Sequence, residues 1–234
     1  MVPKDYRRVF CLHRKAFVLS IGVLCGLLTP VWLKAHTVLA PLGYTLPAPG
    51  TYALPVVKPA TDGEVLDISG IPHRLFDYME GKIVVLSFIY THCSDARGCP
   101  LATGVLYALD AVLQQHTTLG EQVHLLTLSF DPAHDTPEVM RRYARAADGA
   151  APSPFWHRLT TATPEALQPI LDGYGQYVMP IPEGQGYFTR TYTHLLKVFL
   201  IDQQRRVRNI YSVDFLHPQV LLNDIKTLLI TDNN

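Results

Sequence analysis

Two cysteines in the body of the chain are the side chains best suited to chemistry. Cys93 and Cys99 stand six positions apart. Paired thiolates favour Cu(I) or zinc, or they oxidise to each other and form a redox-active disulfide. A purely structural disulfide is a third reading, although a bridge that closes so short a loop constrains the unfolded chain little. The cysteines alone leave these alternatives open.

A third ligand of suitable type would favour a metal over a disulfide. Of the ten histidines, His194 is best placed, because it directly precedes an apolar run, Leu195 to Ile201, that we expect to lie beside the central strand. Two sulfurs and one imidazole leave an open coordination position, which suits a carrier that must release its metal. The alternative for His194 is a strand-edge histidine hydrogen-bonded to backbone.

Two other histidines near these residues are weaker candidates. His92 precedes Cys93, but alternation along an extended chain turns its side chain away from the cysteine sulfur. We interpret His134, with Asp131 and Asp135, as capping residues before a helix. Asp131 also ends a strand, where sites in α/β proteins tend to gather, so a minor electrostatic role is a further hypothesis.

The elements around the cysteines indicate how they are positioned. Residues Ile83 to Ile89 form an apolar, β-rich run that is typical of a strand buried on both faces of a parallel sheet. Pro100 suits the first position of a helix, which we predict to His116. Cys99 then lies at a helix N-terminus, where unpaired amides and the helix dipole favour a thiolate, so we expect an acidic and nucleophilic thiol. Strand, cysteine loop and helix together form a unit of thioredoxin type.

The remaining pattern extends this unit into a complete α/β domain. The order of elements is β, α, β, α, short β, α, β, β, α, with parallel strands first and a hairpin last. The fold class predicted is therefore α/β, a thioredoxin-like central mixed sheet flanked by helices. The expected elements are an edge hairpin at 65–75, strands at 123–130, 195–201 and 206–211, helices at 136–147, 163–173 and 218–230, and an irregular mobile loop at 180–191.

Composition limits the classes of function. The chain has 234 residues, of which 48% are hydrophobic and 17% are charged, so it can bury one substantial core. Its 20 basic and 20 acidic residues balance, and basic residues cluster only near the N-terminus, so we do not expect a nucleic-acid partner. The two remaining cysteines, Cys11 and Cys25, fall in the N-terminal leader.

The leader has the pattern of a membrane segment. Basic residues precede an apolar stretch from Ala16 to Leu33, and 18 helical residues span about 27 Å, just enough to cross a bilayer. We interpret residues 1–40 as an uncleaved signal-anchor with a cytoplasmic N-terminus, or as a cleaved signal peptide. Residues 41–59 contain five prolines and are predicted to be an extended tether. The folded domain is expected to occupy residues 60–234.

Three groups of residues resemble the Sco/SenC family, in the family's order and over roughly residues 60 to 230. The first is Phe88-Ile89-Tyr90-Thr91 with Cys93, followed by Cys99-Pro100. The second is Leu128-Ser129-Phe130-Asp131-Pro132 with Asp135-Thr136-Pro137. The third is His194 before Phe199-Leu200-Ile201-Asp202.

The resemblance implies a thioredoxin-like copper protein that is anchored in the inner membrane and faces the periplasm, or is released there if the leader is cleaved. Carried over by position, the ligands of Cu(I) or Cu(II) are Cys93, Cys99 and His194. Such proteins help metallate the binuclear copper centre of cytochrome c oxidase, by delivering copper or by keeping the acceptor cysteines reduced. The implied partners are an apo copper-enzyme subunit, with cytochrome c oxidase subunit II as the expected one, and a thioredoxin-like reductant.

The chain departs from the family pattern at three places. Five residues separate Cys93 from Cys99 where the family has three, so the cysteines cannot share one face of a regular helix and the segment must loop out, with Gly98 expected to supply a special φ. Thr193 replaces the family's Asp before the histidine, which removes a carboxylate that could orient the ring. Gln203-Gln204-Arg205 replaces a glycine turn.

Two functions of other classes stay open. One is an enzyme, a periplasmic thiol–disulfide reductase for which copper is incidental and which uses Cys93 and Cys99 as its redox pair. The other is a redox or copper sensor that passes its state to a partner. We favour a metallochaperone over both.

Overall fold

The computed structural model describes residues 41–148, 152–181 and 191–231. Within these residues no helix combines the length and the apolar character needed to cross a membrane. The predicted signal-anchor at 1–40 and the central part of the predicted mobile loop, residues 182–190, lie outside the described part of the chain.

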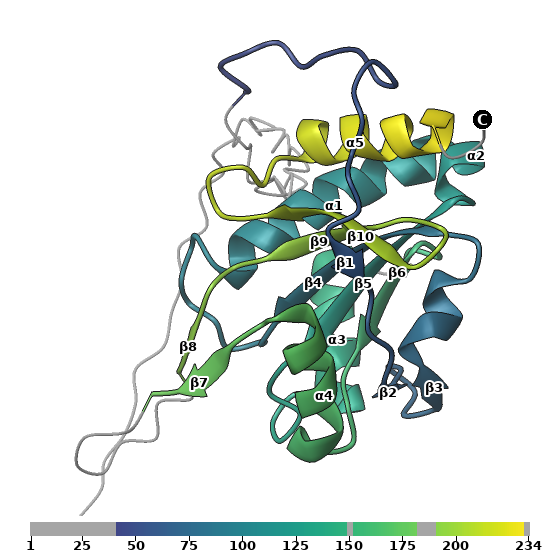
Figure 1. Cartoon of the computed structure of the whole chain (residues 1–234). Coiled ribbons are helices and arrows are strands. Elements are labelled where there is room, and N and C mark those ends of the chain that lie inside the picture. The colour runs from purple at the N-terminus through teal and green to yellow at the C-terminus, as the bar shows by residue number, and fades with distance from the viewer. Residues whose placement is uncertain (1–40, 149–151, 182–190, 232–234) are drawn as a thin grey trace, which may run out of the picture. The chain divides into compact units, whose positions relative to one another are not determined.

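A six-stranded mixed sheet forms the centre of the fold (Figure 1). Its strand order is β1-β10-β9-β4-β5-β6, in which β4, β5 and β6 run parallel and β9 and β10 pair antiparallel. All seven residues of β4 are buried, which confirms the predicted central strand. The strands are β1 (Lys58–Pro59), β4 (Ile83–Ile89), β5 (Val123–Ser129), β6 (Trp156–Leu159), β9 (Val198–Ile201) and β10 (Arg206–Tyr211).

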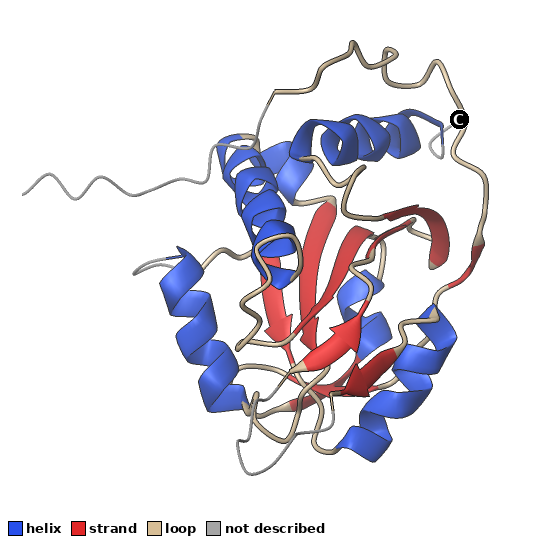
Figure 2. Ribbon diagram, turned by 90° about the vertical axis from the view of Figure 1, so that its left-hand side faces the viewer, coloured by secondary structure: helices blue, strands red, loops and turns tan. Residues whose placement is uncertain are grey.

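Helices cover both faces of this sheet (Figure 2). Alternation along β4 sends Ile83 and Val85 to one face and Val84, Leu86 and Phe88 to the other. The first face packs against α1 (Cys99–Gln115) and α5 (Pro218–Thr231), and the second packs against η1 (Leu75–Met79), α3 (Pro137–Asp148) and α4 (Pro164–Tyr174). A short helix, α2 (Thr117–Gly120), follows α1. The thioredoxin-like α/β arrangement is therefore confirmed.

The helix boundaries follow the capping signals in the sequence. Thr163 caps α4 by accepting a hydrogen bond from the amide of Ala166, at 3.3 Å. The helix ends one residue beyond the predicted Gly173, because Gly175 rather than Gly173 adopts the left-handed conformation that closes it, with φ of 64°. The predicted hairpin also forms, as β2 (Glu64–Leu66) with β3 (Pro72–Arg74), but as a separate two-stranded sheet.

A two-stranded ribbon stands before β9, where the sequence predicted only a loop and the start of a strand. In it β7 (Val178–Pro180) pairs antiparallel with β8 (Tyr192–His194). His194 therefore ends a separate strand, and the sheet strand begins at Val198 rather than at Leu195. The backbone between them is drawn away from the sheet, since Gln176 Nε2 donates to Leu195 O at 2.9 Å and Lys197 Nζ donates to Gly175 O at 2.6 Å. As predicted, β9 lies beside β4.

The proline-rich segment contacts the folded domain before the predicted start at Ala60. Asn223 Nδ2 donates to Pro47 O at 3.0 Å, and the hydroxyl of Tyr52 donates to the buried carboxylate of Asp224 at 2.5 Å. Further along, β1 adds an edge strand to β10. Prolines are compatible with an edge position because the missing amides face away from the ladder. A tether function for the residues before Pro47 stays a prediction.

Two half-buried histidines, His157 in β6 and His124 in β5, make the stability of this fold depend on pH. His157 lies with its ring centroid 4.7 Å from that of His124 and 4.9 Å from that of Tyr78. Burial lowers the pKa of His157 to about 4, and nearby His124 and Arg158 add repulsion. Burial also lowers the pKa of His124. Both rings are therefore neutral in the folded protein at neutral pH.

We predict that the free energy of unfolding decreases as pH falls from about 6.5, where an unfolded histidine begins to gain its proton, towards 4, where His157 does so in the fold. The contribution of His157 to this loss is at most about 3 kcal/mol. Urea unfolding at several pH values measures it. In His157→Gln, which does not titrate, the pH dependence should be shallower, and an unchanged slope would contradict the assignment.

Candidate metal centre

The two cysteines lie where β4 ends and α1 begins. The amide of Cys93 donates to Tyr90 O at 3.2 Å, which closes a turn directly after β4. Cys93 is half-buried, whereas Cys99 is the first residue of α1 and only 2% exposed. This arrangement confirms the predicted helix N-terminus at Cys99.

The five residues between the cysteines loop out, as expected. Asp95 organises this segment, because its carboxylate accepts from the amide of Arg97 at 3.0 Å and its carbonyl accepts from the amide of Gly98 at 2.9 Å. The φ of Gly98 is −98°, so the expectation of a special φ is wrong. What requires glycine here is space, since a Cβ at Gly98 would lie 3.3 Å from the sulfur of Cys93.

Three potential ligand atoms converge at this point. The sulfurs of Cys93 and Cys99 and a ring nitrogen of His194 all lie within 4.8 Å of one another. The Cys99 sulfur is 3.8 Å from His194 Nε2. Among the residues that the structure describes, this is the one such group of three or more histidine, cysteine or carboxylate side chains. The three residues selected from the sequence are therefore brought together.

The spacing of these atoms fits a small soft metal ion. Bonds of about 2.0–2.3 Å to nitrogen and sulfur in a tetrahedral arrangement place neighbouring ligand atoms roughly 3.3–3.8 Å apart. Side-chain adjustments of about 1 Å therefore suffice to close the three atoms on one ion. Two sulfurs and one imidazole suit copper or zinc better than magnesium or calcium, which prefer oxygen.

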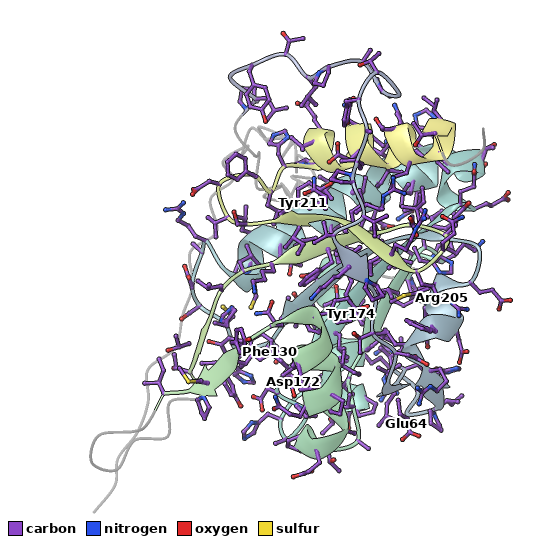
Figure 3. All side chains as sticks on the ribbon, viewed as in Figure 1. Glu64, Phe130, Asp172, Tyr174, Arg205 and Tyr211 are labelled. Carbon is purple, nitrogen blue, oxygen red and sulfur yellow. The ribbon has the colours of Figure 1, made fainter. Side chains whose placement is uncertain are left out.

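Aromatic rings hold the histidine against the cysteines. The ring of His194 lies 5.0 Å from that of Phe130 and 5.8 Å from that of Tyr90, measured between centroids. Figure 3 shows Phe130 beside the β7–β8 ribbon, at the end of β5. His194 Nδ1 is 3.4 Å from the carbonyl of Tyr192, so Nε2 is the nitrogen that faces the sulfurs. A backbone carbonyl thus stands where a carboxylate from residue 193 would be expected to orient the ring.

Comparison with known families agrees with this geometry. The family described as SCO1/SenC matches residues 75–230, which is more than half of the chain. The chain belongs to the SCO1/SenC family. No match was found among curated protein sequences.

Solved structures of Sco proteins have the same fold. Copper-bound ScoI of Bradyrhizobium japonicum is 20% identical, with a TM-score of 0.59 over 72% of this chain and 98% of its own. Apo Sco1 of Thermus thermophilus is 26% identical, with a TM-score of 0.57 over 79% and 96%. BsSco, described as having a disulfide switch and as a member of a family of cytochrome c oxidase assembly proteins, is 19% identical, with a TM-score of 0.57 over 76% and 97%.

In this SCO1/SenC protein the thiol of Cys99 is not acidic, and that expectation is wrong. Burial raises the pKa of the Cys99 thiol well above its ordinary value, and the neighbouring Cys93 raises it further. Hydrogen bonds from the backbone of Tyr90 and, to a smaller extent, from the backbone of Cys99 at the start of α1 favour the thiolate, but removal from water outweighs them. At neutral pH Cys99 is therefore protonated, and a metal must displace that proton to bind.

The other polar residues near the site lie outside the ligand cluster. His92 is exposed, and its Nδ1 is 3.2 Å from the hydroxyl of Thr91. His134 Nδ1 contacts both carboxylate oxygens of the buried Asp131 at 2.9 Å, instead of a helix end. Asp135 bonds to Thr91 and not to the amides of α3, which are capped by Thr136. The capping interpretation of Asp131, His134 and Asp135 is therefore wrong.

No role was predicted from the sequence for the aromatic residues that surround His194. Tyr90, Phe130 and Tyr192 form a cluster of rings with centroids 5.2–5.6 Å apart around His194. Burial raises the pKa of Tyr90 to about 12, with a further contribution from Cys93, so its hydroxyl stays neutral. A signal was present, since Tyr90 and Phe130 each end a buried strand run, at the edge where the carboxyl ends of parallel strands meet.

We predict that iodoacetamide modifies Cys93 at least about tenfold faster than Cys99 in the reduced, metal-free protein. The reason is that Cys99 is buried and its pKa is raised, whereas alkylation requires an accessible thiolate. Peptide mass spectrometry separates the two rates and distinguishes them from those of Cys11 and Cys25. Cys93→Ser and Cys99→Ser serve as controls, and equal rates at the two positions would contradict the prediction.

Proposed function

We propose that this protein binds copper through Cys93, Cys99 and His194 and passes it to another protein during assembly of a copper enzyme. The observation that carries this proposal is the approach of all three ligand atoms to within 4.8 Å of one another in one half-buried site. Two cysteine sulfurs with an imidazole are the donor set that Cu(I) prefers, and the same set also accepts Cu(II).

Copper is the cargo of this site, and the geometry suits its release. Three protein ligands leave a coordination position free, so an acceptor side chain can bind the ion before the first ligand leaves. His194 is held by ring contacts and by a carbonyl at 3.4 Å, which is a long hydrogen bond. It is therefore the ligand that we expect to exchange first.

The acceptor is a protein that can cover this end of the fold. Ligand exchange requires its side chains to come within bonding distance of the ion, so it must contact the ribbon that carries His194. Met179 in that ribbon and Tyr177 and Leu195 directly next to it are more than 60% exposed. Large exposed apolar side chains of this kind are typical of protein contacts.

Membership of the SCO1/SenC family supports cytochrome c oxidase as the enzyme assembled. Its relative BsSco is described as belonging to a family of assembly proteins for that oxidase, and ScoI of Bradyrhizobium japonicum has been solved with copper bound. We propose subunit II, with its binuclear copper centre, as the acceptor. We further propose that the domain acts in the periplasm, attached through the apolar segment at 16–33, and that a thioredoxin-like protein reduces its cysteines.

A thiol–disulfide reductase is the weaker candidate. Its nucleophile must be a thiolate near neutral pH. Burial raises the pKa of Cys99, so this residue is poorly suited to that role, and only Cys93 is accessible. A metal site uses both sulfurs and also accounts for the position of His194.

We predict that His194→Ala lowers the affinity for Cu(I) at least about tenfold, because it removes one of three ligands. Titration of the full-length reduced protein against a chromophoric Cu(I) chelator measures this affinity. His92→Ala is the matched control, since it removes a histidine next to Cys93 but outside the ligand cluster, and its affinity should be unchanged. Equal affinities of the wild type and His194→Ala would remove His194 from the site.

A further inference from the structure

The lengthened segment between the cysteines raises the question of what fixes their spacing. Residues 94–98 are organised by local hydrogen bonds around Asp95. Their contact with a distant part of the fold is an ion pair of 2.7 Å between Arg97 and Asp214, whose side chains are 72% and 75% exposed. Exposed ion pairs contribute little to stability. The segment itself is therefore poorly suited to hold the two sulfurs in register.

Buried hydrogen bonds fix the chain just before Cys93. The amide and the hydroxyl of Thr91, two residues before Cys93, both donate to the carboxylate of Asp135, at 2.9 and 2.6 Å. Ser129 donates a third hydrogen bond to the same carboxylate at 2.6 Å. Asp135 is 0% exposed, and all three donors are uncharged. These three hydrogen bonds compensate the burial of the carboxylate, and two of them fix the position of Thr91.

A second set of hydrogen bonds fixes the backbone at Cys99. Thr103 lies one turn after Cys99 in α1, and its hydroxyl donates to Cys99 O at 2.8 Å. The hydroxyl of Tyr143 is 2.5 Å from the same Thr103 oxygen. Because Thr103 has used its single hydroxyl hydrogen on Cys99, Tyr143 is the donor. Burial raises the pKa of Tyr143 to about 12, so it retains the hydrogen that it donates.

Both contacts come from one element of the fold. Asp135 lies two residues before the start of α3 and Tyr143 lies within the helix, and α3 packs on the opposite face of the sheet from α1. We propose that Asp135 and Tyr143, here called the α3 support, are positioning residues that set the separation of Cys93 and Cys99 through Thr91 and Thr103. The α3 support thus supplies the constraint that a short intercysteine segment would otherwise give. The expected effect on copper affinity rests on the proposed copper-binding function, whereas the positioning of the two cysteines does not.

Two variants each weaken a link between the α3 support and a cysteine segment without removing a candidate ligand, and two control variants leave both of these links in place. Thr91→Val and Tyr143→Phe each delete one hydroxyl that links α3 to a cysteine segment. Ser129→Ala deletes a hydroxyl bonded at the same 2.6 Å to the same carboxylate, but from β5, which carries no cysteine. Arg97→Ala removes the exposed ion pair of the intercysteine segment.

The first measurement is made on the reduced, metal-free full chain. Alkylation of the buried Cys99 requires local opening, so we expect its rate to rise at least about fivefold in Thr91→Val and Tyr143→Phe. In Ser129→Ala and Arg97→Ala it should stay within about twofold of the wild type. Urea unfolding of each variant checks that Thr91→Val and Ser129→Ala lose similar global stability, so that a difference in alkylation reports on positioning.

The second measurement is Cu(I) affinity by chelator competition. We expect a loss of about tenfold in Thr91→Val and in Tyr143→Phe, the range typical of residues that orient metal ligands, and a change within about twofold in the controls. Alkylation rates or affinities that do not separate the two pairs of variants would overturn the inference while leaving wild-type copper binding intact. A wild type that binds no copper would instead overturn the proposed function, and the alkylation test would still decide the role of the α3 support.

Discussion

Pairing of β9 with β4 is the interaction on which the site depends. The register aligns Ser87 with Val198, so the chain that enters β9 passes the same end of the sheet at which β4 releases the cysteine turn. His194 and Cys99 are 95 positions apart in sequence, yet their ligand atoms are 3.8 Å apart. Ordering so long a stretch of chain costs conformational entropy that local contacts cannot offset. The buried apolar strands on both faces of the sheet supply that stabilisation, and the site is built on their ends.

Burial gives the site its particular chemistry. Because Cys99 is removed from water, its thiol keeps its proton in the absence of metal, and a metal ion must supply enough binding energy to displace it. A soft ion that bonds strongly to sulfur can do so, whereas a weakly bound ion cannot. The same burial slows the attack of Cys99 on disulfides. A buried thiol at Cys99 beside the ring of His194 therefore favours metal exchange over thiol exchange, although the residue types allow both.

Features set by residues close together in the sequence could be predicted, and features set by contacts between distant residues could not. The largely apolar run of β4 and the proline after Cys99 are local signals, and both elements form where they were expected. The three side chains that meet at the candidate site could be chosen from the sequence because cysteine and histidine are chemically distinct. Asp135 was misread because its partner Thr91 lies 44 positions away, while its near neighbours have the pattern of a helix cap. The acidity of Cys99 was misjudged for the same reason, since the helix terminus is visible in the sequence and the burial is not.

The five residues between the cysteines show how a fold can accept an insertion next to its most constrained site. An insertion in a loop costs little by itself, since the entropy of closing a loop grows slowly with its length. It becomes harmful only where the loop must also fix the distance between its ends. Here each end has contacts outside the loop, since Thr91 bonds to Asp135 and Cys99 bonds to Thr103, which is bonded to Tyr143, so the added residues can project outward. The remaining requirement is steric, because a Cβ at residue 98 would lie 3.3 Å from both the Cys93 sulfur and the Asp95 carbonyl oxygen, closer than ordinary van der Waals contact. The number of residues between the two cysteines therefore constrains such a site less than the contacts that fix the chain before Cys93 and after Cys99.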